Sequence, residues 1–215
     1  MKQPVIILFF TALFPLLIKG QHLPREDSLR KVWMLEQNDS LKAWKHLAYI
    51  EALLADRKQT EALKELGPLQ AEIKDHYPKG LQAWVHYYDG IARYYQYDFI
   101  NSIIANEKLG RLAVQEALPD TFRHITAISL ITLGVSYSKI NDPENAQLSY
   151  QKAIPQLQAL NDSTRLVHVY LNLGYLFTKS QDWASAKNVF TKGLSYLNKE
   201  SNEDFSVPLY ASLST

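Results

Sequence analysis

The stretch LGVSYSKINDPENAQLSYQKAI, residues 133–154, returns in altered form as LGYLFTKSQDWASAKNVFTKGL, residues 173–194. Between the two copies small residues stay small, aromatic residues stay aromatic, and the polar break keeps its aspartate. The match therefore indicates one structural unit that is used twice. The positions that carry this signature are Leu133 and Leu173, Gly134 and Gly174, Tyr137 and Phe177, Ala146 and Ala186, and Tyr150 and Phe190.

The same interval appears in the first half of the chain. LKAWKH at residues 41–46 and LQAWVH at residues 81–86 agree at four of six positions and are separated by the same distance along the sequence. A fixed period of about 40 residues is typical of stacked repeats, so we predict four units across residues 41–200. One small residue recurs in step with these units, with a slightly longer step between its second and third occurrence: Ala62, Ser102, Ala146 and Ala186.

Each unit has the pattern of two helices. In the fourth copy, apolar residues from Leu166 to Phe177 follow a spacing of three and four, and a second stripe of this kind begins at Ala186 after a polar break. Sustained alternation, the pattern of a strand, is absent. The small residues predict the points where two helices cross closely. Ser40, Asp120 or Thr121, and Ser163 or Thr164 are the N-caps that we expect.

These residues resemble the tetratricopeptide repeat family, in which Leu-Gly, an aromatic residue, Asp, Ala and a second aromatic residue recur in this order. The third and fourth copies match well. The second matches weakly, because Asp89, Arg93 and Asn106 stand where large apolar residues are expected. The resemblance implies an all-α, right-handed superhelical solenoid of antiparallel helix pairs. The basic repeat of the family has about 34 residues, so these units are longer.

The N-terminal stretch MKQPVIILFFTALFPLLIKGQ has a lysine at position 2 and an apolar segment from Val5 to Ile18. A spanning helix needs about 20 apolar residues, so this shorter segment behind a basic start predicts a signal peptide over residues 1–20. The alternative is an uncleaved membrane anchor. Because the chain has no cysteine, it has no lipobox. We expect an exported, periplasmic protein with a lead-in segment at 21–40 and no membrane span in the mature chain.

Composition narrows the chemistry. The formal net charge is +1, from 23 basic and 22 acidic residues, so nucleic acid is not an expected partner. Without cysteine there is no disulfide, thiolate zinc site or cysteine nucleophile. The six histidines form no metal pair, and no nucleophile elbow or phosphate-binding loop is present. Carboxylates such as Glu51, Asp56, Glu61 and Glu65 are interpreted as a solvated face. We predict no enzyme activity, no cofactor and no metal.

The stretch WVHYYDGIARYYQYDF, residues 84–99, is unusually aromatic, with seven Trp, Tyr or Phe among sixteen residues. The resemblance implies that the first helices of successive units line a concave groove that binds peptides. The residues that we place in this groove are Trp84, Tyr87, Ile91, Tyr94 and Tyr95 in the second copy, Ile128, Ile131, Val135, Ser138 and Lys139 in the third, and His168, Leu171, Tyr175, Thr178 and Lys179 in the fourth.

Two alternatives stay open for this groove. Aromatic residues at helical spacing are usually core residues, so the stretch at 84–99 can also be explained by packing. Lys139 and Lys179 recur one period apart on the same face. They form either a small basic ladder for an acidic or carboxylate-bearing segment or a pair of solubilising charges.

Carried forward once more, the period predicts Tyr210 and Leu213, and both are present. Residues 201–215 therefore have the pattern of a partial fifth repeat with only its first helix, which is either a cap or the start of missing sequence. The function that we predict is a non-enzymatic scaffold that binds a protein or peptide. The alternative is the truncated sensory region of a membrane signalling protein, either a histidine kinase or a helix-turn-helix transcriptional regulator.

Overall fold

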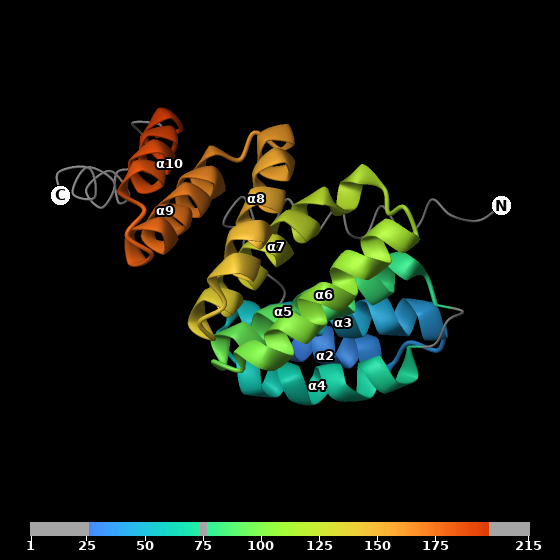
Figure 1. The fold of residues 1–215 in the computed structure, drawn as a ribbon. Helices are drawn as coiled ribbons and strands as arrows, with labels where there is room; N and C mark the ends of the chain where they lie inside the picture. Colours follow the sequence, from blue (N-terminus) through green and yellow to red (C-terminus); the bar gives the residue numbers. More distant parts are fainter. Residues whose placement is uncertain (1–25, 74–76, 198–215) are drawn as a thin grey trace. The chain divides into compact units, whose positions relative to one another are not determined.

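The structure is a computed structural model that describes residues 26–73 and 77–197, and this part of the chain contains helices and no strand (Figure 1). The predicted signal peptide and the partial fifth repeat lie outside the described residues. The helices are α2 (Glu26–Met34), α3 (Asp39–Ala55), α4 (Gln59–Glu72), α5 (Lys79–Tyr95), α6 (Phe99–Gln115), the short 3₁₀ helix η1 (Asp120–Phe122), α7 (Arg123–Lys139), α8 (Pro143–Ala159), α9 (Ser163–Lys179) and α10 (Trp183–Ser195).

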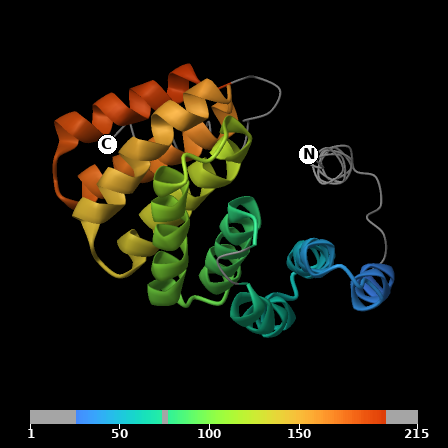
Figure 2. The same ribbon diagram turned by 90° about the vertical axis from the view of Figure 1, so that its right-hand side faces the viewer.

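The helices pack in consecutive pairs, which confirms the predicted all-α fold. In both views α8 lies along α7, and α10 lies along α9 (Figure 2). Helix α2 falls within the lead-in segment and packs on α3. None of the helices in the described ranges combines the length and the apolar character that crossing a bilayer requires.

The chain forms two compact units, one extending up to Tyr88 and the other beginning at Asp89, so α5 contributes residues to both. In the first unit the fully buried side chains come from three helices: Leu47, Ile50 and Leu53 of α3, Leu66 and Leu69 of α4, and Leu81 of α5. In the second unit, the largest fully buried side chains are Leu109, Ile125, Tyr150, Leu157, Leu166 and Phe190. Each unit therefore has its own apolar core.

Helix length explains the period. Helices α7, α8 and α9 have 17 residues each, and only three residues join each one to the next helix. Two such helices with two such connections reproduce the step from Gly134 to Gly174. The connection from α6 to α7 is longer and runs over residues 116–122, including η1. Its four additional residues produce the longer step between Ser102 and Ala146.

The three-residue connections share one design. Their middle residue has a positive φ, and asparagine tolerates this left-handed conformation better than most residues: φ is 63° at Asn141, 53° at Asn161 and 62° at Gln181. The third residue is an aspartate whose side chain accepts a hydrogen bond from the backbone N–H three residues later and so caps the next helix. These aspartates are Asp142, Asp162 and Asp182.

The predicted N-caps are wrong in position. Helix α3 is capped by Asn38, which accepts from the backbone N–H of Leu41, and not by Ser40. Helix α9 is capped by Asp162, because the three-residue connection places its carboxylate, and not Ser163 or Thr164, before the first turn. Helix α7 continues directly from η1 without a capping side chain.

Glycine allows the paired helices of the third and fourth copies to approach closely. A Cβ atom on Gly134 would overlap the ring of Tyr150, and a Cβ atom on Gly174 would overlap the ring of Phe190. Both rings are buried, as are Ala146 and Ala186 one turn before them. The glycine of the first helix and the ring of the second therefore form a single contact.

We expect Gly174→Ala to lower the free energy of unfolding by about 1–3 kcal/mol, because the new methyl group has to displace Phe190. Gly110→Ala is the matched control. It also lies inside a helix, but no atom would come within 4 Å of its Cβ, so only the gain in helix propensity of up to about 1 kcal/mol applies. Urea unfolding followed by circular dichroism measures both. A Gly174→Ala variant as stable as the wild type would contradict this contact.

Candidate functional site

The aromatic stretch at 84–99 divides into two ring clusters. Within the first unit, the ring of Trp84 stacks on Tyr88 with centroids 5.4 Å apart and meets the edge of Tyr87 at 5.5 Å. Tyr88 is buried, whereas Trp84 and Tyr87 are half-buried. This first cluster thus serves packing at least in part, which was the alternative left open by the sequence.

Tyr88 also changes the interpretation of Glu51. Burial raises the pKa of the Glu51 carboxyl, although a nearby Tyr88 hydroxyl opposes this effect. Burial likewise raises the pKa of Tyr88, with the charge of Glu51 adding to it. Glu65 is also not a simple surface charge, because its Oε2 lies 2.8 Å from Nε2 of the buried His46. The prediction that these carboxylates form a solvated face is therefore wrong for Glu51 and Glu65.

A second ring cluster, which we call the turn cluster, consists of Tyr94, Tyr95, Tyr97 and Phe99 in the second unit. Its rings contact one another at centroid distances of 5.4 to 6.1 Å. Two members are open to solvent: Tyr95 is 58% exposed and Tyr97 is 81% exposed. Tyr97 has a φ of 60°, a conformation that is uncommon for an aromatic residue. Large exposed rings on one turn are a feature of binding surfaces.

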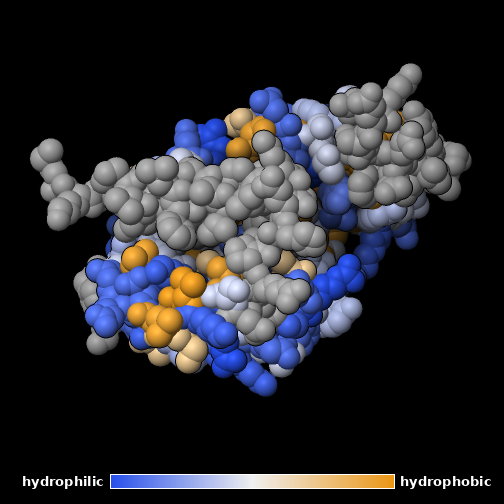
Figure 3. All heavy atoms as spheres, turned by 180° about the vertical axis from the view of Figure 1, so that it is seen from behind, coloured by the Kyte–Doolittle hydropathy of each residue, from blue (hydrophilic) through white to orange (hydrophobic). Residues whose placement is uncertain are grey.

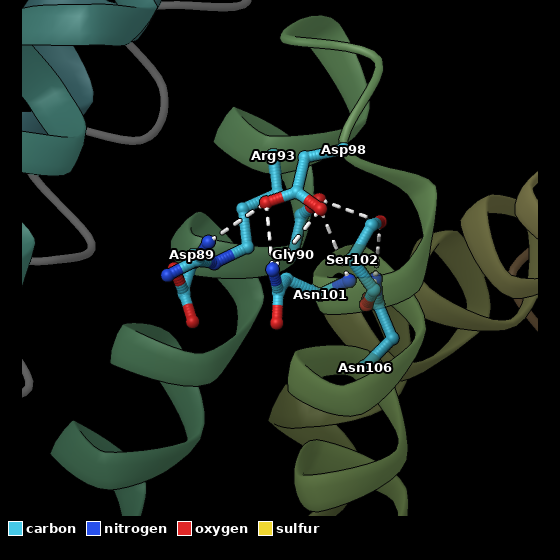
Figure 4. A network of polar contacts seen from close by, with 7 residues as sticks. All are labelled: Asp89, Gly90, Arg93, Asp98, Asn101, Ser102 and Asn106. Carbon is cyan, nitrogen blue, oxygen red and sulfur yellow. Dashed lines mark hydrogen bonds and ion pairs between the residues drawn. The ribbon is translucent and has the colours of Figure 1, made fainter.

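An ion-pair clamp supports this turn. Arg93 of α5 lies between two carboxylates, with Nε 2.7 Å from Oδ1 of Asp89 and Nη1 3.0 Å from Oδ2 of Asp98 (Figure 4). Burial of Asp98 disfavours its charge, but hydrogen bonds from Asn101 and the ion pair with Arg93 prevail and lower its pKa. The clamp holds the end of α5 to the beginning of α6, directly beside Tyr97.

The second copy builds its helix crossing from polar groups. Gly90 stands where the later copies have Gly134 and Gly174, and it faces the side chain of Asn106 instead of an aromatic ring. The Ser102 hydroxyl donates to the Gly90 carbonyl at 2.9 Å, and Nδ2 of Asn106 donates to the Ser102 carbonyl at 2.8 Å (Figure 4). Ser102 and Asn106 are both fully buried. The residues that weakened the sequence match therefore replace apolar packing with hydrogen bonds.

The remaining groove residues that we predicted lie on α7 and α9. Lys139 and Lys179 are exposed, and the Lys179 ammonium donates to Oδ1 of Asn141 at 2.8 Å. Tyr175 is 49% exposed and touches Phe190 with its ring edge. His168 is half-buried, and burial, followed by the charge of Arg165, lowers its pKa.

The predicted residues thus differ in accessibility. Tyr95, Tyr175, Lys139 and Lys179 are exposed, whereas all other residues assigned to the groove, among them Trp84, Tyr87, Tyr94 and His168, are half-buried. Sequence reasoning missed Tyr97 as a surface residue, because it lies in a turn outside the helical spacing that was used to choose the groove. Within residues 26–73 and 77–197, no group of three or more His, Asp or Glu side chains is arranged to hold a metal ion.

Comparison with known proteins gives a likeness in fold. No protein-family model matches the chain, and no curated protein sequence matches it. The crystal structure of BtubC (BKLC) from P. vanneervenii aligns with a TM-score of 0.69 at 13% identity, covering 88% of this chain and 79% of that one. NprR, solved in complex with its cognate peptide NprX, aligns with a TM-score of only 0.39 at 14% identity, covering 87% of this chain and 75% of that one. The likeness to BtubC supports the all-helical fold.

Proposed function

We propose that this protein is a non-enzymatic scaffold of tetratricopeptide type that binds a protein or peptide through the exposed face of its first helices. The observation that carries the proposal is the exposure of Tyr95 on α5 and Tyr175 on α9, together with the exposed Lys139 on α7. Tyrosine combines apolar area with a polar tip and is enriched among residues that dominate binding energy. The lysines favour a partner segment that carries carboxylates.

Apolar side chains are exposed on the surface as well. Figure 3 shows one face of the molecule, on which hydrophobic side chains gather in one area among hydrophilic ones. Large apolar side chains that are more than half exposed also include Tyr97, Ile100 and Val114 in the second unit.

The proposal includes export, which is supported by the basic start and the apolar segment from Val5 to Ile18. N-terminal sequencing of the protein recovered from the exported fraction of expressing bacteria tests this part. A mature chain that begins near Gln21 is the expected result, and a chain that keeps Met1 in the cytoplasm would contradict export.

The binding face is tested by comparing exposed aromatic residues on first and second helices. We expect the double variant Tyr95→Ala/Tyr175→Ala to lower the affinity for the captured partner by at least about tenfold, because two exposed contact residues are truncated. Trp183→Ala is the matched control, since Trp183 is 59% exposed but lies on the second helix α10. The partner is first captured from the exported fraction by cross-linking, and titration then measures its affinity for each variant.

An equal loss of affinity in the double variant and in Trp183→Ala would contradict the assignment to the first helices. Circular dichroism of each variant shows whether helicity is retained. Partner binding that is lost only in the control would place the partner on the second helices instead.

A further inference from the structure

A pocket of about 870 Å³ lies in the second unit, outside the predicted groove. Its lining comes from α6, from the connection that includes η1, and from α7 and α8. Helix α7 packs against both α6 and α8 and forms the floor. The longer α6–α7 connection belongs to this place: Leu118, Pro119 and Asp120 all line the pocket. The pocket therefore lies at the one connection, among α6 to α10, that is longer than three residues.

The pocket and the predicted groove use opposite sides of α7. The α7 residues that line the pocket are Arg123, Thr126, Ser129, Leu130, Leu133 and Tyr137. The residues assigned to the groove, from Ile128 to Lys139, follow a complementary spacing. With 3.6 residues per turn, the mean directions of the two sets lie about 160° apart. A ligand in this pocket is therefore separate from the partner in the proposed function.

The apolar part of the lining is suited to a hydrophobic face. Leu130 and Leu133 form the floor, and the half-exposed Leu148 stands on the α8 wall. On the α6 wall, Gly110 is exposed and a Cβ there would meet no atom within 4 Å. Because Gly110 has no side chain, the backbone of another helix can approach α6 closely at this position.

The charged side chains of the lining are three cations, Arg111, Arg123 and Lys152, and two anions, Glu107 and Asp120. Glu107 already accepts from the Tyr137 hydroxyl at 2.6 Å and from Arg111 at 3.4 Å. Asp120 already pairs with Arg123. Lys152 makes no ion pair within the described part of the chain, and it is exposed on the α8 wall. The unmatched charge of the pocket is therefore positive.

We propose that this pocket binds an acidic amphipathic helix of a partner protein. A trough between two helices that is floored by a third receives a further helix in the manner of helix-in-groove recognition. The apolar face of the partner helix covers Leu130, Leu133 and Leu148. A carboxylate of that helix pairs with Lys152, which forms no ion pair with any described residue.

The test uses two synthetic helical peptides of about four turns with leucine at the spacing of one helix face. One carries glutamate on the flanks of that face, and its twin carries lysine at the same positions. Fluorescence anisotropy of labelled peptide with the full protein measures the affinity of each. We expect the acidic peptide to bind several-fold more tightly than its twin, because it forms an exposed ion pair with Lys152 where the twin places a like charge.

Variants decide where the acidic peptide binds. Gly110→Leu fills the low wall and is expected to weaken binding at least about tenfold, while Gly67→Leu, where a Cβ also meets no atom within 4 Å, leaves it unchanged. Lys152→Glu should reverse the preference between the twins, whereas Lys187→Glu, exposed on α10, should not.

Three outcomes overturn the proposal: no binding of the acidic peptide at millimolar concentration, equal binding of the twins, or binding that Gly110→Leu does not weaken. In the last case, loss of binding in Lys139→Glu/Lys179→Glu moves the acidic peptide to the opposite side of α7. Failure of the pocket is thus distinguishable from failure of the proposed first-helix face.

Discussion

Phe190→Ala is expected to lower the free energy of unfolding by about 3–5 kcal/mol, because it removes a fully buried ring and leaves a cavity. The ring packs with Val167 and Ala186, and partly buried apolar side chains surround this group. It also covers the backbone of Gly174. Urea unfolding followed by circular dichroism measures the loss. Trp183→Ala on the same helix is the control, and we expect a change within about 0.5 kcal/mol there, because Trp183 is exposed.

A double-mutant cycle tests the contact itself. The penalty of Gly174→Ala arises from the ring of Phe190, so this substitution should cost little in a Phe190→Ala background. Additive penalties would mean that glycine is needed at position 174 for a reason other than the ring. Equal losses in Phe190→Ala and Trp183→Ala would contradict the packing of the fourth pair.

The fold was predictable from sequence because its main constraint is steric and recurs. Gly134 faces Tyr150 and Gly174 faces Phe190 in the same way, so the same residue types return at the same spacing. An alignment of the chain with itself therefore already reveals the helix pairs. The connection lengths are equally regular, since three residues with a left-handed middle position and a capping aspartate are one repeated solution.

The polar crossing of the second copy could not be predicted in this way. Asn106 is a departure from the pattern in sequence, and its meaning depends on Gly90 and Ser102, which are brought to it by the packing of α5 and α6. The pocket depends on the α6–α7 connection in the same manner. The longer step between Ser102 and Ala146 shows in the sequence that this connection has additional residues. It does not show that a pocket forms between α6 and α8. Tyr97 was not predicted as a surface residue because it lies in a turn, where helical spacing does not apply.

Asn106→Asp is expected to lower the free energy of unfolding by about 3–5 kcal/mol at pH 7, because it places an unpaired charge in a fully buried position. The amide of Asn106 donates to the Ser102 carbonyl, and a carboxylate cannot do so. Its Oδ1 accepts no hydrogen bond within the described residues, so no donor is ready for a second carboxylate oxygen. The clamp nearby already holds two carboxylates against the single guanidinium of Arg93.

This loss should depend on pH in a defined direction. Burial disfavours the charged form, so the pKa of an aspartate at position 106 is higher in the folded chain than its unfolded value of about 3.9. Below the unfolded pKa the carboxyl is protonated in both states, so the buried charge carries no penalty. The penalty grows as the pH rises from there and is complete above the folded pKa. The difference in unfolding free energy from wild type is therefore smallest near pH 4 and widens toward pH 7.

Two control variants should show a difference from wild type that stays constant over this range. Asn106→Leu removes the amide without adding a charge, and Asn188→Asp adds a carboxyl at an exposed position on α10. Urea unfolding of the variants and the wild type at each pH measures these differences. A penalty for Asn106→Asp that is small at pH 7, or that does not change with pH, would show that Asn106 is not enclosed in the crossing.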